Sequence, residues 1–165
     1  MSRKSGFSLI ELLIVVAIIL IIAAIALPNL IRARIAANEA SAVASLRTIS
    51  TAELTYKISY PTIGYTDLLT LGGPVPCTPS AAAGCLIDPV LASTLKSGYK
   101  FAATPSATGG TIMDQYLVTA VPQTPSVSGT KGFCQIEDHV IMFINPANGP
   151  ASRAVCDGGT YAPVQ

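Results

Sequence analysis

An apolar run near the N-terminus restricts what this chain can fold into more than any other feature of its sequence. Residues Phe7 to Leu27 form 21 consecutive positions with a single charge, Glu11. As a helix the run would be about 30 Å long, enough to cross the hydrocarbon core of a bilayer. A short polar leader, Met1 to Gly6, precedes it. Arg32 and Arg34 follow it, so basic residues on both sides leave the orientation undecided.

Composition supports a membrane segment and excludes several classes of protein. Half of the 165 residues are hydrophobic, only 12% are charged, and the mean hydropathy of +0.54 is too high for an ordinary soluble domain. The net charge of +1 gives no electrostatic footprint for nucleic acid. The 13 glycines and 12 prolines exclude an all-helical protein, and the apolar character excludes disorder throughout. We therefore expect one modest domain in addition to the apolar segment.

Three interpretations of the apolar run are compatible with its residues. A cleaved secretory signal peptide would use the small residues at Ala24-Ile25-Ala26, but the run is long for such a peptide and Pro28 follows closely. A plain membrane anchor would carry Glu11 as a tolerated charge near the interface. In the third, favoured interpretation, cleavage after Gly6 frees an α-amine on Phe7. This ammonium and the Glu11 carboxylate then neutralise each other, within one chain or between neighbours in a bundle.

The residues around Gly6 carry a resemblance to a known family. The segment Gly6-Phe7-Ser8-Leu9-Ile10-Glu11-Leu12 resembles the processing and methylation motif of type IV prepilins, with Ser8 where Thr is commoner. Leu13 to Pro28 is similar to the pilin N-terminal helix, including the proline near its end. The similarity continues to Ala40 and covers about the first third of the chain.

The resemblance implies a structural protein rather than an enzyme. It implies that a prepilin peptidase cuts after Gly6 and methylates the nitrogen of Phe7, and that Glu11 guides docking into a growing filament. Before assembly the chain would cross the inner membrane once, in contact with lipid and an assembly platform, with its head outside the cytoplasm. It would then polymerise with copies of itself into an extracellular pilus. Two alternatives stay open: a periplasmic pseudopilus of a type II secretion system, and a membrane-anchored extracytoplasmic binding module.

The first helix is expected to continue well past Pro28. A proline removes one backbone donor and kinks or loosens a helix without necessarily ending it, and residues 30–57 contain no Gly or Pro. At 100° per residue one stripe collects Ile35, Ala42, Val43, Leu46, Ile49 and Tyr56. Glu39 and Glu53 fall inside that stripe, and we expect them where it frays into solvent. Pro61 then ends a helix of about 50 residues.

The remainder of the chain predicts a small antiparallel sheet. Proline and glycine mark residues 72–84 as loop, and residues 88–97 are expected to form a short helix that buries Val90, Leu91 and Leu95. Strand-like segments lie at 99–103, 116–120, 131–136 and 139–144, the last two flanking a tight turn at Glu137-Asp138, and the run after Pro146 is expected to be loop. The predicted fold is therefore α+β and pilin-like, with one long helix packed on three to four strands.

These elements predict four segments along the chain. Residues 1–6 are the leader, 7–28 the transmembrane and filament-core helix, 29–58 its amphipathic continuation, and 59–165 a β-rich extracytoplasmic head. Processing is assigned to Gly6 and Phe7, and assembly to Glu11 and Pro28.

Four cysteines, Cys77, Cys85, Cys134 and Cys156, allow three disulfide pairings. We favour Cys77 with Cys85 and Cys134 with Cys156, because each bond closes a loop-rich segment locally, for about 2–4 kcal/mol each. Disulfides require an oxidising compartment, which agrees with a head outside the cytoplasm. Four buried free thiols are the alternative, and the absence of a C-x-x-C pair argues against zinc.

Other sites find little support in the sequence, which predicts no cofactor, metal or nucleic-acid partner. His139, the single histidine, has no G-x-S-x-G motif to accompany it and is expected to be a strand-end residue. No phosphate-binding G-x-x-x-x-G-K-[ST] segment is present. Asp157-Gly158-Gly159 offers one carboxylate, too few for a Ca²⁺ shell, and is expected to form a turn.

Overall fold

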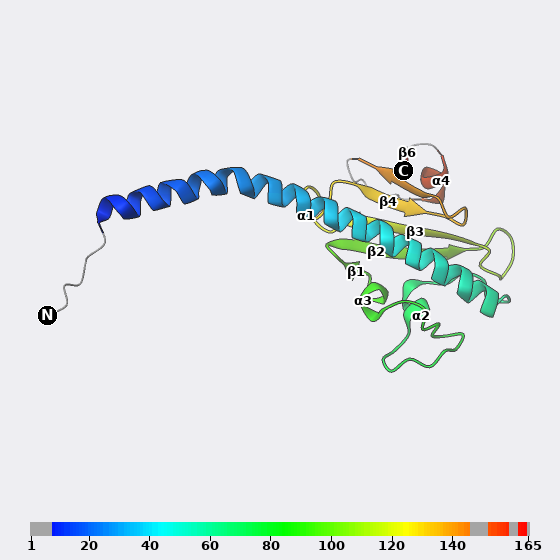
Figure 1. Cartoon of the computed structure of the whole chain (residues 1–165). Coiled ribbons are helices and arrows are strands. Elements are labelled where there is room, and N and C mark those ends of the chain that lie inside the picture. The colour runs from blue at the N-terminus through cyan, green and yellow to red at the C-terminus, as the bar shows by residue number, and fades with distance from the viewer. Residues whose placement is uncertain (1–7, 146–151, 159–161, 165) are drawn as a thin grey trace. The chain divides into compact units, whose positions relative to one another are not determined.

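The computed structural model describes residues 8–145, 152–158 and 162–164 of the chain (Figure 1). The chain divides into two compact units, Met1–Arg34 and Ile35–Gln165. The first helix, α1, runs over Leu9–Ser59 with Pro28 inside it and contributes to both units. The expected helix of about 50 residues is therefore confirmed, as is its continuation past the proline.

The part of α1 in the first unit is apolar on every side. Every large apolar side chain from Leu9 to Ile31 is between 46% and 79% exposed. By length and composition this is the helix in the described part of the chain that could cross a membrane, with a mean hydropathy of 3.3 in its most apolar window. A helix that is hydrophobic all round needs an apolar environment, which a membrane or the interior of an assembly supplies.

The second unit is built on a six-stranded antiparallel sheet whose strands follow one another in chain order (Figure 1). The strands are β1 (Leu95–Lys96), β2 (Tyr99–Ser106), β3 (Gln115–Pro122), β4 (Gly132–Gln135), β5 (Ile141–Ile144) and β6 (Ala162–Pro163). The four longer strands match the four expected segments, so the α+β class is confirmed. The count of three to four strands is too low, because β1 and β6 have only two residues each, too few to show an alternating pattern.

One stripe of α1 packs against one face of this sheet. Ala42, Leu46, Ile49 and Tyr56 of the predicted stripe are buried, while Ile35 and Val43 are half-buried. Alternate residues of the two longest strands meet the stripe: Tyr99 and Phe101 from β2, and Tyr116, Val118 and Ala120 from β3. The predicted cover of the sheet by the helix is therefore confirmed, and it forms the main core.

The other face of the sheet carries a smaller cluster around a disulfide. Cys134 on β4 and Cys156 on α4 (Arg153–Asp157) are buried together with Ile136, and Leu117 and Met142 pack against them. Because β4 is covered on both faces, all four of its residues are buried.

Three short helices differ from the expectation. The helix expected over 88–97 is wrong beyond its first turn: α3 spans Pro89–Ala92, and a positive φ of 71° at Thr94 precedes β1. A second positive φ, 49° at Ser97, lies in the turn from β1 to β2. Of its three predicted core residues only Leu91 is buried, while Val90 and Leu95 are 56% and 45% exposed.

The described part of the run after Pro146 contains α4 and β6 rather than loop alone. The sequence does not predict the helix α2 (Leu68–Gly72), because five residues are too few to show a helical period.

A close approach at Gly129 gives a test of this packing. A Cβ added there would lie 2.0 Å from Tyr99 Oη, whose ring is fully buried and whose hydroxyl donates to the Lys131 carbonyl at 2.8 Å. We expect Gly129→Ala to destabilise the chain by about 1–3 kcal/mol, because the tyrosine has nowhere to move. Gly109→Ala is the matched control, since no neighbouring atom lies within 4 Å of its added Cβ. Thermal unfolding of the full chain in detergent compares the two, and equal melting temperatures would contradict the described packing.

Candidate functional site

Glu11 lies in the first turn of α1 and hydrogen-bonds to the start of the helix. Its Oε2 accepts from the Ser8 backbone N–H at 3.0 Å. Ser8 directly precedes the first helical residue, so Glu11 occupies the position from which a carboxylate reaches back to an unpaired backbone donor. The sequence predicts for Glu11 only a charge that pairs with an amine. The hydrogen bond to Ser8 N adds a second role, capping of the helix N-terminus. Gly6 and Phe7 lie outside the described residues.

Pro28 sits within α1 without ending it. It has no N–H for the carbonyl four residues earlier, so one hydrogen bond of the helix is missing at this point. The proline therefore marks a weaker place in the backbone of an otherwise apolar helix.

Glu39 is not solvated, and the expectation that it lies where the stripe frays is wrong. Its Oε1 accepts hydrogen bonds from Thr130 N at 2.9 Å, Thr130 Oγ1 at 2.8 Å and Lys131 N at 3.2 Å. The Lys131 ammonium lies 3.8 Å from Oε2, and the Glu39 side chain is only 13% exposed. Next to it, Asn38 Nδ2 donates to the Ser128 carbonyl at 2.8 Å. These side chains attach the loop between β3 and β4 to α1.

Glu53 is wrongly predicted in the same way and is more deeply buried. It is fully buried in the main core, and its Oε2 accepts the Thr66 backbone N–H at 3.0 Å. Its Oε1 has no hydrogen-bond partner among the described residues. Burial, which disfavours the charged form, raises the pKa of this carboxyl to about 7.

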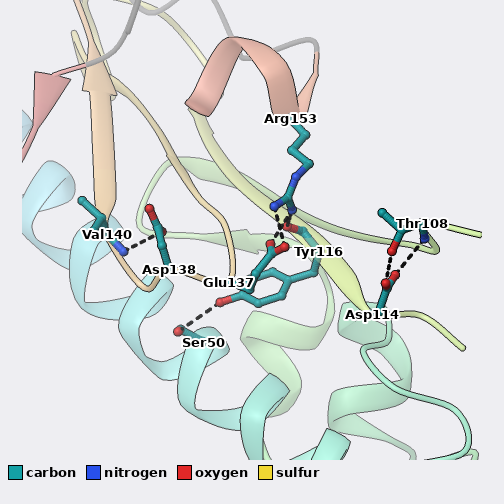
Figure 2. A network of polar contacts seen from close by, with 8 residues as sticks. All are labelled: Ser50, Thr108, Asp114, Tyr116, Glu137, Asp138, Val140 and Arg153. Carbon is teal, nitrogen blue, oxygen red and sulfur yellow. Dashed lines mark hydrogen bonds and ion pairs between the residues drawn. The ribbon is translucent and has the colours of Figure 1, made fainter. Parts of the chain in front are cut away.

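A polar network joins the hairpin between β4 and β5 to the rest of the head (Figure 2). The Arg153 guanidinium pairs with the Glu137 carboxylate and donates to the Tyr116 carbonyl at 3.2 Å. Burial works to raise the pKa of Glu137, but the hydrogen bonds and charge of Arg153 together with hydrogen bonds from the backbone hold that pKa below its usual value. On the other side of β3, Ser50 and the buried Tyr116 hydroxyl lie 3.2 Å apart. The network therefore ties α4 and α1 to the same strand.

His139 belongs to this hairpin rather than to a strand end. It lies between β4 and β5 with a φ of 62°, and its Nδ1 hydrogen-bonds to Ser50 Oγ. In the part of the chain that the structure describes, no carboxylate hydrogen-bonds to this imidazole, so a Ser-His-Asp arrangement is not formed.

Both disulfides have the favoured pairing. Cys77 and Cys85 are bonded with Cα atoms 5.9 Å apart, and Cys134 and Cys156 with Cα atoms 6.1 Å apart. The alternative of four free thiols is wrong. The first bond closes the exposed loop that follows α2, and the second attaches α4 to β4.

Metal-ligating side chains do not gather anywhere in residues 8–145, 152–158 and 162–164, where no group of three His, Cys, Asp or Glu could hold an ion. Asp157 ends α4 and Gly158 caps it, so the described part of Asp157-Gly158-Gly159 closes a helix. The interactions described above are helix capping, loop attachment and disulfide bonding.

Comparison with known proteins locates the N-terminal segment in a family. Residues 1–27 match the family described as the prokaryotic N-terminal methylation motif. The chain is 46% identical over 54 residues to the "Type IV major pilin protein PilA" of Myxococcus xanthus, covering 33% of this chain and 24% of that protein. The N-terminal segment of the chain is therefore similar to that motif, and part of the chain is similar to a type IV pilin.

A second relative is also named as a pilus component. The "Type IV wide pilus major component PilA4" of Thermus thermophilus is 54% identical over 46 residues, which cover 28% of this chain and 35% of that protein. The chain thus matches about a quarter to a third of the length of these curated relatives. No solved structure matches it.

The attachment at Glu39 gives a prediction for the head. Glu39→Ala removes the acceptor for two backbone N–H groups and a hydroxyl, and we expect a loss of about 2–4 kcal/mol in the free energy of unfolding. Glu39→Gln keeps one acceptor oxygen and should fall between. Arg47→Ala changes an exposed residue of the same helix and should cost no more than about 0.5 kcal/mol. Denaturant midpoints compare the three; a Glu39→Ala midpoint equal to that of Arg47→Ala would mean that Glu39 is solvated after all.

Proposed function

We propose that the chain is a structural subunit of a type IV pilus, made as a prepilin and polymerised through the first half of α1. The observation that carries this proposal is a 51-residue helix whose first half exposes apolar side chains on every side. Such a surface is stable in a membrane before assembly and among identical helices after it. The relatives are named as pilus components, which favours a pilus over a secretion pseudopilus.

Processing is the first step of the proposed pathway. A prepilin peptidase cuts after Gly6 and methylates the nitrogen of Phe7, which leaves the polar leader behind and begins the mature chain at the apolar helix. The mature chain then waits as a single-pass inner-membrane protein with its disulfide-bonded head outside the cytoplasm. An assembly platform in that membrane adds it to the filament.

Intact mass of the membrane-extracted protein tests processing. We expect the chain to begin at Phe7 and to carry one additional methyl group. Gly6→Val should leave uncleaved precursor in the membrane, because a side chain there obstructs close approach of a peptidase to the backbone. Ser8→Thr, which keeps a small hydroxyl, is the control and should be processed normally. An N-terminus at Met1 or at Leu27 in the unaltered protein would contradict the proposal.

Assembly needs something more specific than apolar burial. A helix that leaves lipid for a bundle of similar helices gains little from the hydrophobic effect, since lipid is as apolar as leucine. A charge pair between Glu11 and the Phe7 amine of a neighbouring subunit would fix the register between the two helices. Small residues at Ala17, Ala23, Ala24 and Ala26 would allow close packing.

The two roles of Glu11, charge and helix cap, are separated by three substitutions. Glu11→Ala removes both, Glu11→Gln keeps an acceptor for the Ser8 N–H without the charge, and Glu11→Asp keeps the charge with a shorter reach. Removing the charge should ease membrane insertion by up to about 3 kcal/mol, so a plain anchor would tolerate every variant. A filament subunit should fail with Ala and with Gln, because each leaves a buried amine unpaired at every added subunit.

Sheared surface fractions and whole membranes, probed for the same chain, provide the measurement. We expect the Ala and Gln variants to be cleaved and present in membranes yet absent from filaments, with Asp intermediate. Normal filament yield from Glu11→Gln alone would assign the residue to capping. Normal yield from Glu11→Ala would favour an anchored binding module.

A further inference from the structure

Glu53 is the only charged side chain among the described residues that is fully buried. It projects from α1 toward the segment Ile63–Asp67, which joins α1 to α2. A single hydrogen bond, from Thr66 N to Oε2, links the carboxylate to that segment. The other oxygen is buried without a partner.

The elements around Glu53 offer it no positive charge. Asp67, at the start of α2, adds a like charge nearby, and Tyr56 of α1 and Tyr116 of β3 are the other titratable groups that interact with it. Lys57 lies next to this region, but its ammonium sits over the Tyr65 ring, 4.2 Å from the centroid. Within the described residues no Lys, Arg or His forms an ion pair with Glu53.

Such surroundings favour the protonated carboxyl over the carboxylate. A buried carboxylate is stable when several donors or a cation compensate for the lost water, and here one N–H is the whole compensation. Glu39 on the same stripe has three donors and a lysine, and it serves as the natural comparison. The raised pKa of Glu53, about 7, agrees with this geometry.

The segment that Glu53 holds is also joined to the loop between β2 and β3. Tyr65 N donates to the Met113 carbonyl at 2.8 Å, and Met113 N donates to the Ile63 carbonyl at 2.9 Å. The Tyr65 ring packs on the Tyr116 ring with centroids 4.6 Å apart. A change at Glu53 is therefore passed to two loop segments of the head.

We propose that Glu53 is a proton-dependent latch: the protonated side chain keeps Ile63–Asp67 docked on α1, and loss of the proton releases this segment together with its contacts to Met113. Release lets the carboxylate reach water. Because the proton is held more tightly in the docked state, docking is strongest in acid, weakens as the pH rises from about 4.5 toward 7, and is constant above that range. The latch acts within one head and does not depend on filament assembly.

Amide hydrogen exchange on the full chain in detergent micelles tests the latch. We expect the protection factors of Tyr65, Thr66 and Met113 to fall on the order of tenfold between pH 5.5 and pH 8, after correction for intrinsic exchange rates. Amides of the central strand β3 should keep their protection over the same range. Glu53→Gln cannot ionise and should abolish the pH dependence.

Two control variants separate Glu53 from other titratable groups. Glu39→Gln removes a carboxylate of the same stripe that is well compensated, and His139→Gln removes the single histidine of the chain. Both should keep the unaltered pH dependence at Tyr65 and Thr66. A dependence lost in His139→Gln, or retained in Glu53→Gln, would overturn the proposal.

A direct titration covers the case in which Glu53→Gln fails to fold. The ¹³C signal of the Glu53 carboxyl carbon in the unaltered chain should titrate near pH 7. A midpoint below about pH 5 would show that the carboxylate is well solvated or compensated, and would overturn the latch.

Discussion

Without the buried stripe of α1, the sheet of the second unit would have no large apolar layer to pack against. Its two longest strands direct alternate side chains toward the helix, and an antiparallel sheet with one covered face is stable only when that cover is apolar. The same helix carries, in the first unit, a surface that is apolar all round. One continuous element thus provides the apolar cover of the sheet and an exposed apolar segment.

Within that interface two of the three carboxylates of α1, Glu39 and Glu53, act as attachment points. Glu39 and Glu53 are about four helical turns apart, so both point toward the sheet side of the helix. Glu39 accepts the backbone donors of the loop at Thr130 and Lys131, and Glu53 accepts the one at Thr66. Each thereby supplies a buried acceptor to a loop whose N–H groups would otherwise be unpaired, but only Glu39 is fully compensated. This difference is why one carboxylate is a stable anchor and the other is sensitive to protons.

The periodic parts of the chain could be predicted from sequence, whereas the parts that depend on tertiary neighbours could not. The 3.6-residue period identified the stripe that includes Leu46 and Ile49, and the alternation around Phe101 and Val118 identified the central strands. Local closure of loops was enough to select the disulfide pairing. The period shows which face a residue occupies but not what lies opposite, so the burial of Glu39 and Glu53 was missed. Two-residue strands and one-turn helices carry no period at all.

The central claim is that the apolar half of α1 assembles identical chains into a filament. A helical reconstruction by electron cryomicroscopy of filaments sheared from the cell surface tests this claim most directly. The account predicts density for this chain beginning at Phe7, with the apolar halves of α1 from many subunits packed together at the filament centre. Each Glu11 carboxylate should lie within hydrogen-bond distance of the amine of a Phe7. Filaments that lack this chain, while it stays in the membrane with its leader attached, would contradict the account.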